Sequence, residues 1–284
     1  MSNLRSESES TTARDAPADA VLAATAGAPL ILSLDTATEV RSVAVVRGER
    51  VLACTRGQVL RENSARVLHD VAETLSASGV KLEDIELFAA AIGPGSFTGL
   101  RSGLATVKAF AATLNRRVAG IPTLHAIAYA CGPTARVLAC LPAGRGEVFA
   151  QLLSVDDAKA VRELSEPFHL SPAAVFEKAA NRGGDLKWAG RGAHAHAGAI
   201  REFAIEKGIV WRDPDAREAE SGANGSDLDD NVCWTLAPPS ESYATQIAAL
   251  GLMNYLDGST LVAEDLQALY VRLSDAELNE RCRA

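Results

Sequence analysis

The 284-residue sequence has no excess of basic residues, no closely spaced cysteine pair and no apolar run long enough to cross a bilayer. Its 28 Lys and Arg residues stand against 36 Asp and Glu residues, which leaves a net charge of −8. A chain with this charge has no electrostatic basis for gripping a phosphate backbone unaided. We therefore expect any contact with nucleic acid to pass through a partner.

The cysteines are few and scattered, and none belongs to a C-x-x-C motif. This spacing indicates neither a zinc site nor a disulfide framework, so a reducing cytoplasm fits best. The positions are Cys54, Cys131, Cys140, Cys233 and Cys282.

The N-terminal region contains an apolar stretch at residues 20–34 that is too short for a transmembrane helix. No cluster of positive charge precedes it, which argues against a secretory signal. Its second half, LILSLD, is typical of a buried strand that ends in a polar turn. We predict a disordered tail over residues 1–28 and no membrane association.

Common ligand-binding and catalytic motifs are also missing. Gly95 and Gly99 are separated by three residues and have no adjacent lysine, so they do not form the phosphate loop G-x-x-x-x-G-K-[ST]. Residues 93–99 are one residue too long for the dinucleotide motif G-x-G-x-x-G. No G-x-S-x-G occurs, and no two histidines have the spacing of metal ligands on one helix. The sequence thus predicts no metal site.

The apolar pattern predicts an α/β fold of two successive units with mixed sheets and flanking helices. The first unit, residues 29–132, reads as a three-stranded meander followed by alternating helices and strands. Its helices are expected at 62–78, 97–114 and 123–131, and its later strands at 85–93 and 116–122.

The second unit, residues 133–284, repeats this plan in a more degraded form. It contains an acidic stretch at 213–230 that lacks apolar periodicity and is expected to be a surface loop. Two strands are expected within 135–155, shorter strands at 186–190 and 208–212, and helices at 172–180, 195–207 and 242–256.

Two turns of the first unit are candidates for a nucleotide site. LDTATE resembles the phosphate-binding turn of actin-like and hexokinase-like ATPases, where the aspartate acts through Mg²⁺. Ala37 limits how closely the backbone amides of this turn approach an anion. Asp35 is therefore either a catalytic carboxylate or a hydrogen-bond acceptor for its own turn.

The second candidate is the glycine-rich sequence AIGPGSFTGLRSGL, at the start of the helix 97–114. Ser96 fits the position of a helix cap, and the free amides after it would also attract an anion. We favour the turn over the anion site. The residues of this nucleotide or structural loop are Asp35, Thr36, Gly93, Gly95, Ser96 and Gly99.

The helices 62–78 and 97–114 have wide apolar faces. On the first helix, Val67, Val71 and Leu75 form one line, and Leu68, Ala72 and Leu75 form an adjacent one. Such a face can cover a sheet on one side and another molecule on the other. On the second helix, Gly103 predicts close approach of another element, inside or outside the chain. The second helix's apolar stripe consists of Leu100, Leu104, Val107, Ala111 and Leu114.

Six segments taken in order resemble the TsaB family, also called YeaZ, from about residue 30 to the C-terminus. GPGSFTGLR after DTAT is the most specific of them. The others are ILSLDTATEVRSVAVV, ENSARVLHDV, GIPTLHAIA, AGRGEVFAQL and LYVRLSDAE.

This resemblance implies an actin-like ATPase (ribonuclease H-like) fold with two lobes. It also implies a cytoplasmic, non-catalytic subunit that binds the catalytic paralogue TsaD, with the ATPase TsaE, in the machinery that makes threonylcarbamoyladenosine at tRNA position 37. The metal-binding H-x-x-x-H pair of TsaD is replaced here by Asn63 and Val67, which cannot supply two imidazoles. The alternative is an actin-like ATPase or kinase that uses Asp35 and the loop 93–99.

The family also implies that the helices 62–78 and 97–114 bind TsaD or a second copy of the chain. Nucleotide and Mg²⁺ are then expected only at the assembled interface, and tRNA only through the complex. The predicted partner-binding residues are Asn63, Val67, Val71, Leu75, Phe97, Leu100, Gly103, Leu104 and Val107.

Overall fold

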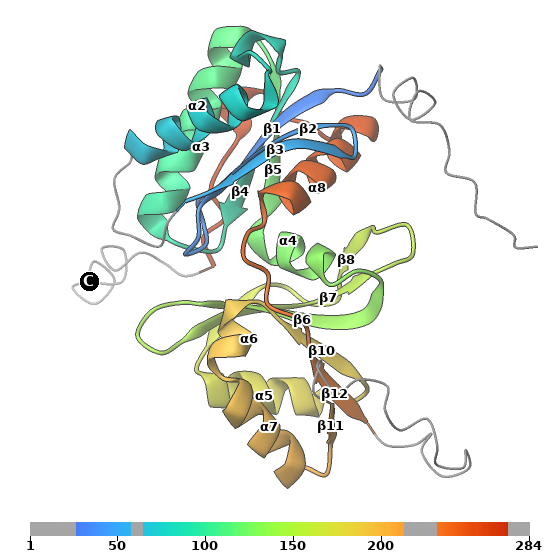
Figure 1. Ribbon diagram of the computed structural model, residues 1–284. Helices are drawn as coiled ribbons and strands as arrows, with labels where there is room; N and C mark the ends of the chain where they lie inside the picture. Colours follow the sequence, from blue (N-terminus) through green and yellow to red (C-terminus); the bar gives the residue numbers. More distant parts are fainter. Residues whose placement is uncertain (1–26, 58–64, 213–231, 272–284) are drawn as a thin grey trace, which may run out of the picture.

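The computed structural model describes residues 27–57, 65–212 and 232–271. They form two lobes stacked one above the other, each built around its own β-sheet (Figure 1). Most of the predicted tail 1–28, the whole acidic stretch 213–230 and Asn63 lie outside the described residues.

The first sheet is mixed, as the sequence predicted. An antiparallel meander of three strands continues into two parallel strands reached by helical crossovers. In spatial order the strands are β3 (Arg50–Arg56), β2 (Ser42–Arg47), β1 (Leu30–Asp35), β4 (Leu87–Gly93) and β5 (Arg117–Pro122).

Both faces of this sheet are buried at its central strands. Phe88 and Ala90 of β4 join the core under α2 (Ala65–Ser78) and α3 (Phe97–Leu114). The intervening Leu87, Ala89 and Ala91 join the core under α8 (Ala244–Leu256). This division explains why the strand reads as a nearly continuous apolar run, because alternate residues point to opposite faces and both faces are covered.

Helix α3 has the boundaries that the sequence predicted. Ser96 Oγ accepts a hydrogen bond from the Gly99 amide at 3.2 Å, which confirms the predicted helix cap. At the other end, Asn115 adopts the left-handed conformation with φ of 50° and stops the helix.

The second sheet carries its helices mainly on the far side from the first lobe (Figure 1). Its core packs Trp188 against Trp234 and Phe176. The strands follow the order β11 (Val210–Arg212), β12 (Cys233–Leu236), β10 (Leu186–Ala189), β6 (Thr134–Pro142), β7 (Val148–Val155) and β8 (Val161–Glu163), while β9 (Phe168–Leu170) pairs with β7. The helices are α5 (Pro172–Asn181), α6 (Arg191–Ala195) and α7 (Ala197–Glu206).

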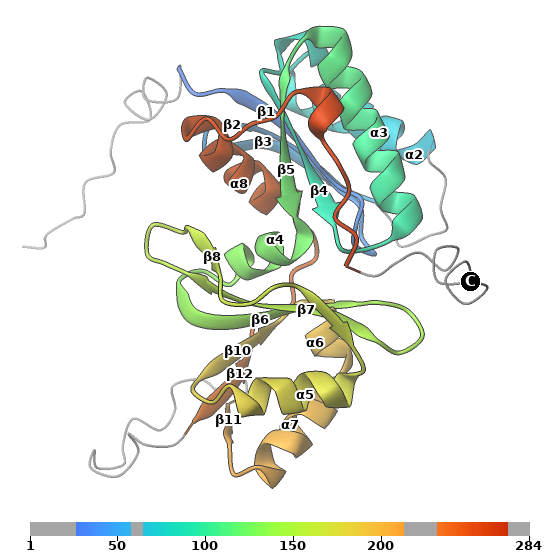
Figure 2. The same ribbon diagram turned by 180° about the vertical axis from the view of Figure 1, so that it is seen from behind.

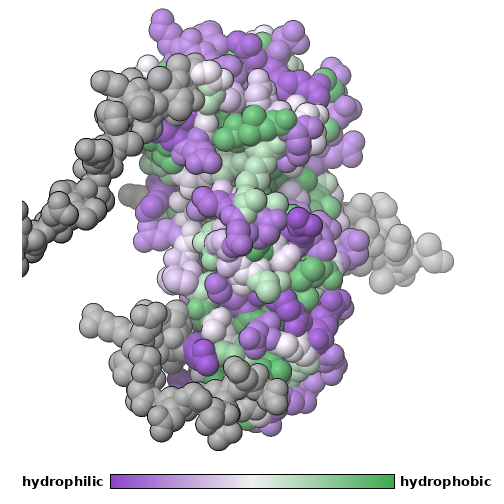
Figure 3. Space-filling view, turned by 90° about the vertical axis from the view of Figure 1, so that its right-hand side faces the viewer, coloured by the Kyte–Doolittle hydropathy of each residue, from purple (hydrophilic) through white to green (hydrophobic). Residues whose placement is uncertain are grey.

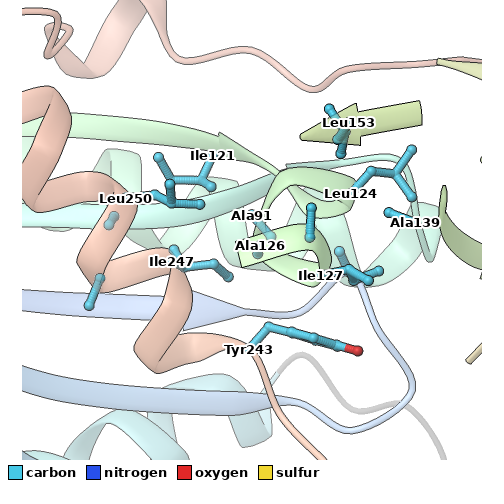
Figure 4. Close-up of a cluster of buried hydrophobic side chains, with 14 of the residues drawn as sticks. Ala91, Ile121, Leu124, Ala126, Ile127, Ala139, Leu153, Tyr243, Ile247 and Leu250 are labelled. Atoms are coloured by element: carbon cyan, nitrogen blue, oxygen red, sulfur yellow. The ribbon is translucent and has the colours of Figure 1, made fainter. Parts of the chain in front are cut away.

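One hydrophobic cluster joins the two lobes (Figure 4). It is centred on α4 (Thr123–Ala130) and α8, which lie between the sheets. Ile121 of β5 and Ile247 of α8 reach it from the first lobe, Ile127 comes from α4, and Ala139 and Leu153 come from the second sheet. Because all five are buried, the space between the lobes is filled by side chains of the chain itself.

The C-terminal part of the chain corrects the predicted division at residue 133. Helix α8 packs on the first sheet, so residues 244–271 belong to the first lobe and not to the second. The chain passes from the first lobe to the second and then back again. The prediction divided the chain at a single position and therefore missed the second crossing. Helix α8 is apolar enough to be buried against either sheet, so its own sequence does not say which.

The segment Ser259–Val271, here called the C-terminal strap, runs along the open edge of the first sheet and the flank of α3 (Figure 2). Leu261 exchanges two backbone hydrogen bonds with Val118 of β5. A short 3₁₀ turn, η2 (Ala263–Asp265), and the buried Leu266 follow. The strap therefore closes the edge that β5 would otherwise leave unpaired.

Candidate interaction site

The turn after β1 uses Asp35 as its internal acceptor. The Asp35 carboxylate accepts hydrogen bonds from the Ala37 amide at 3.0 Å, the Thr38 amide at 3.3 Å and the Thr38 hydroxyl at 2.6 Å. The side chain is fully buried, and this burial raises its pKa to about 6, although the three hydrogen bonds oppose the rise. Of the two interpretations of Asp35, the geometry supports the hydrogen-bond acceptor.

Three glycines of the next loop and helix pack against this turn. Gly95, Gly99 and Gly103 follow one another at four-residue intervals, and a Cβ at any of them would come closer than 3.0 Å to an atom of Thr36 or Ala37. The Ser96 amide also donates to the Ala37 carbonyl at 2.8 Å. The element that Gly103 was predicted to approach is therefore this turn of the same chain.

This packing leaves little of the turn for a phosphate. The amides of Ala37 and Thr38, which face the phosphates in the ATPase interpretation, donate to Asp35. The end of the turn is also held across the lobes, since Glu39 forms an ion pair with Arg191 at 2.6 Å. The loop 93–99 and the turn 35–38 thus serve as a seat that fixes the position of α3 on the sheet.

The predicted partner-binding stripes face inward, which corrects most of that prediction. Val67 and Val71 of α2 are 2% and 3% exposed, and Leu75 is half-buried. Among the described members of the predicted set, only Phe97 is well exposed, at 42%. The remaining members, Leu100, Gly103, Leu104 and Val107, are buried by the chain itself.

The physical reason for this error is the spacing itself. A helix on a sheet needs an apolar stripe over 100° wide merely to cover that sheet. The strongest stripe of α2 and α3 is therefore the one that the fold consumes. The weaker adjacent line, noted in the sequence as Leu68 and Ala72, is the one that points outward.

Several small or apolar residues are exposed on the outward side of α2 and α3, and the part of the surface that contains them is here called the outer face. Leu68 is 53% exposed although it is a large aliphatic residue. Short side chains at a helix surface allow another helix to approach closely. The outer face consists of Leu68 and Ala72 on α2 and Thr98, Arg101, Ala105, Ala109 and Ala112 on α3, all exposed.

Comparisons with known proteins match the part of the chain that contains α2 and α3. The family model described as TsaD, tRNA N6-adenosine threonylcarbamoyltransferase, matches residues 58–188, which include α2 and α3. The Escherichia coli K12 protein named tRNA threonylcarbamoyladenosine biosynthesis protein TsaB is 28% identical over 250 residues, covering 85% of this chain and 94% of that protein. Together these matches support a member of the TsaB/YeaZ family. The TsaB protein of Haemophilus influenzae is 35% identical over 123 residues, covering 42% of this chain and 51% of its own.

Solved structures of the family share the fold. YeaZ from Pseudomonas aeruginosa superposes with a TM-score of 0.61 at 22% identity, over 85% of this chain and 99% of that one. A second structure, described as similar to peptidase YeaZ from the same organism, gives a TM-score of 0.63 at 23% identity, over 86% of this chain and 100% of that one. The predicted two-lobed α/β fold is confirmed, and these YeaZ structures share it.

The remaining predictions concern metal and membrane. Within residues 27–57, 65–212 and 232–271, no three His, Cys, Asp or Glu side chains gather as metal ligands do. Val67, one of the two positions of the missing H-x-x-x-H pair, is buried in the core. In the same part of the chain, no helix is both long and apolar enough to span a membrane.

Proposed function

We propose that this chain is a non-catalytic scaffold subunit that binds TsaD through the outer face. With TsaE, the complex transfers a threonylcarbamoyl group to N6 of adenosine 37 in cytoplasmic tRNAs that read codons beginning with A. The tRNA is contacted through the complex, in keeping with the net charge of −8. ATP or ADP with Mg²⁺ binds at the assembled interface and not to this chain alone.

The exposure of the outer face is the observation that carries this proposal. Leu68 is 53% exposed, and Ala72 of α2 and Ala105, Ala109 and Ala112 of α3 are exposed as well. The TsaD family model matches the region that contains both helices, so a TsaD chain is expected to carry a related pair. Two such pairs form a four-helix contact, and an interface of standard size buries about 1,600 Å² in total.

The same reasoning covers self-association. Because the outer face would meet a related helix pair in TsaD, a second copy of this chain offers a similar surface. We expect homodimers of the isolated chain to form through the same residues and to be displaced by TsaD. An ion pair or aromatic contact specific to TsaD would give the heterodimer its preference.

The alternative, an ATPase or kinase that uses Asp35 and the loop 93–99, has less support. The Asp35 carboxylate already accepts hydrogen bonds from the amides of the turn, and the glycines of α3 pack against the other side of the turn. If the alternative were right, the isolated protein would hydrolyse ATP with Mg²⁺, and Asp35→Asn would lower that rate by orders of magnitude.

The test replaces exposed residues of the outer face with arginine. Leu68→Arg and Ala105→Arg should each weaken binding to purified TsaD by at least tenfold, because each places a charge in an apolar contact. Binding is measured by isothermal titration calorimetry, with size-exclusion chromatography as a second readout. In a reconstituted reaction with TsaE, ATP and tRNA, both variants should also form less threonylcarbamoyladenosine.

Matched controls carry the same change elsewhere. Leu256 is 73% exposed at the end of α8. One side of the molecule carries a small apolar patch on the upper lobe (Figure 3). Leu256→Arg, and Ala130→Arg on α4, should leave TsaD binding unchanged. If the wild-type chain binds TsaD and none of the four substitutions changes that affinity, the outer face is not the docking site.

A further inference from the structure

An exposed stack of three side chains lies where the C-terminal strap meets the start of α3. The rings of Tyr270 and Phe97 are 5.8 Å apart, and the Arg101 guanidinium lies 3.8 Å from the centre of the Phe97 ring. Tyr270 is 51% exposed and Phe97 is 42% exposed, so neither ring is needed to fill the core. The stack forms a rigid aromatic and cationic surface at one end of the outer face.

The backbone holds this stack in place. The Leu269 amide, next to Tyr270, donates to the Ile92 carbonyl of β4 at 2.7 Å. Gly93 allows this approach, since it has φ of +114° and a Cβ there would lie 2.6 Å from the Leu269 carbonyl oxygen. Leu266, four residues before Tyr270, is 1% exposed and fixes the strap in the core between the sheet and α3.

Arg101 has a free edge for a partner. Its guanidinium plane is covered by Phe97 on one side, and among the described residues it forms no ion pair with a carboxylate. An arginine that is stacked and unpaired is preorganised to bind a carboxylate through its N–H groups. Tyr and Arg are also the side chains that contribute most often to the energetic centre of protein interfaces.

We propose that the C-terminal strap completes the TsaD-binding surface, with Tyr270, Phe97 and Arg101 as its anchor and an acidic side chain of TsaD paired with Arg101. This inference rests on the proposed function and specifies which part of the surface provides affinity. It also gives the heterodimer a preference over the homodimer, because facing copies of Arg101 would repel each other.

The experiment compares tyrosines on opposite faces of the first sheet. Tyr270→Ala should raise the Kd for TsaD at least tenfold, which corresponds to about 1.4 kcal/mol. Tyr255→Ala on α8, where the ring is 40% exposed, is the matched control and should change the Kd less than twofold. Both variants should unfold within about 2 °C of the wild type, since both rings are half exposed.

Arg101 provides a second arm that does not depend on how the strap folds. Arg101→Gln should weaken TsaD binding at least fivefold and flatten its salt dependence, while Arg101→Lys should restore part of both. If Tyr270→Ala detaches the strap and lowers the unfolding temperature, the Arg101 variants alone test the proposal.

The outcomes separate the two proposals. If the wild-type chain does not bind TsaD at all, the proposed function fails and this inference fails with it. If the wild type binds and both Tyr270→Ala and Arg101→Gln bind within twofold of it, the scaffold role stands and the anchor is wrong. A loss of homodimer without any change in TsaD affinity would likewise overturn the anchor.

Discussion

The inner and outer sides of α2 and α3 both carry apolar residues, but these residues have different surroundings. Val71 and Val107 on the inner side are 3% and 0% exposed, whereas Leu68 on the outer side of α2 is 53% exposed. The inner stripe is regular because it must match a sheet along its whole length. The outer face needs only a few small residues and one or two large ones, so its pattern is irregular.

This difference shows that the clearest periodicity on a helix identifies what the fold buries. A surface that binds a partner is found among the apolar residues that remain exposed once the residues of the core have been identified. For this chain, substitutions on the inner side should act on folding, while those on the outer face should act on binding. The predictions below test that separation, beginning with the largest effect on stability.

Gly103→Leu should destabilise the protein most, by about 3 kcal/mol or more, because the new side chain overlaps Thr36 in a closely packed seat. Thermal unfolding measured by circular dichroism checks this, and the expected result is a large drop in Tm or insoluble protein. Ala109→Leu, on the exposed side of the same helix, is the matched control and should unfold near the wild-type temperature. A stable, well-folded Gly103→Leu protein would show that α3 does not pack closely against the turn at Thr36.

Asp35 gives the second prediction, which depends on pH. Burial raises its pKa from 3.8 to about 6 in the folded chain, so the native state holds a proton more tightly than the unfolded state. Stability should therefore fall as the pH rises from about 4 to 6 and then level off. One pKa unit is worth about 1.4 kcal/mol, so the penalty at neutral pH is about 3 kcal/mol.

Asp35→Asn removes this penalty. Its amide can donate to the Thr38 hydroxyl, which is free to turn its own proton toward the Val40 carbonyl at 3.3 Å. The variant should be more stable than the wild type at pH 7.5 and no more stable at pH 4, as measured by Tm across that range. A variant that is less stable at pH 7.5 would show that the carboxylate is favourable in its charged form.

Sequence reasoning succeeded where a local rule decides the structure. The cap at Ser96, the limits of α3 and the parallel strand β4 all follow from short patterns and are confirmed. The fold class and the family followed from motifs spread along the chain, and they are confirmed too.

It failed where distant parts of the chain had to meet. Thr36 and Gly103 are in contact but lie 67 positions apart in the sequence. A glycine in a helix indicates that another element approaches closely, but it does not indicate which element. The return of α8 to the first sheet and the course of the strap are also long-range choices. The strands β8, β9 and β12, of three or four residues each, were not predicted.

The smallest effect on stability comes from neighbouring positions of α2. Val71→Ala removes two buried methyl groups and should cost about 2 kcal/mol, since the core cannot close fully around the loss. Leu68→Ala removes more side chain, but from an exposed position, and should change stability by less than about 0.5 kcal/mol. The effects on TsaD affinity should have the opposite order, with Leu68→Ala weakening binding and Val71→Ala leaving the affinity of the folded fraction unchanged. Urea denaturation and calorimetric titration of both variants would measure the two orders, and the same order in both experiments would show that the outer face is only an extension of the core.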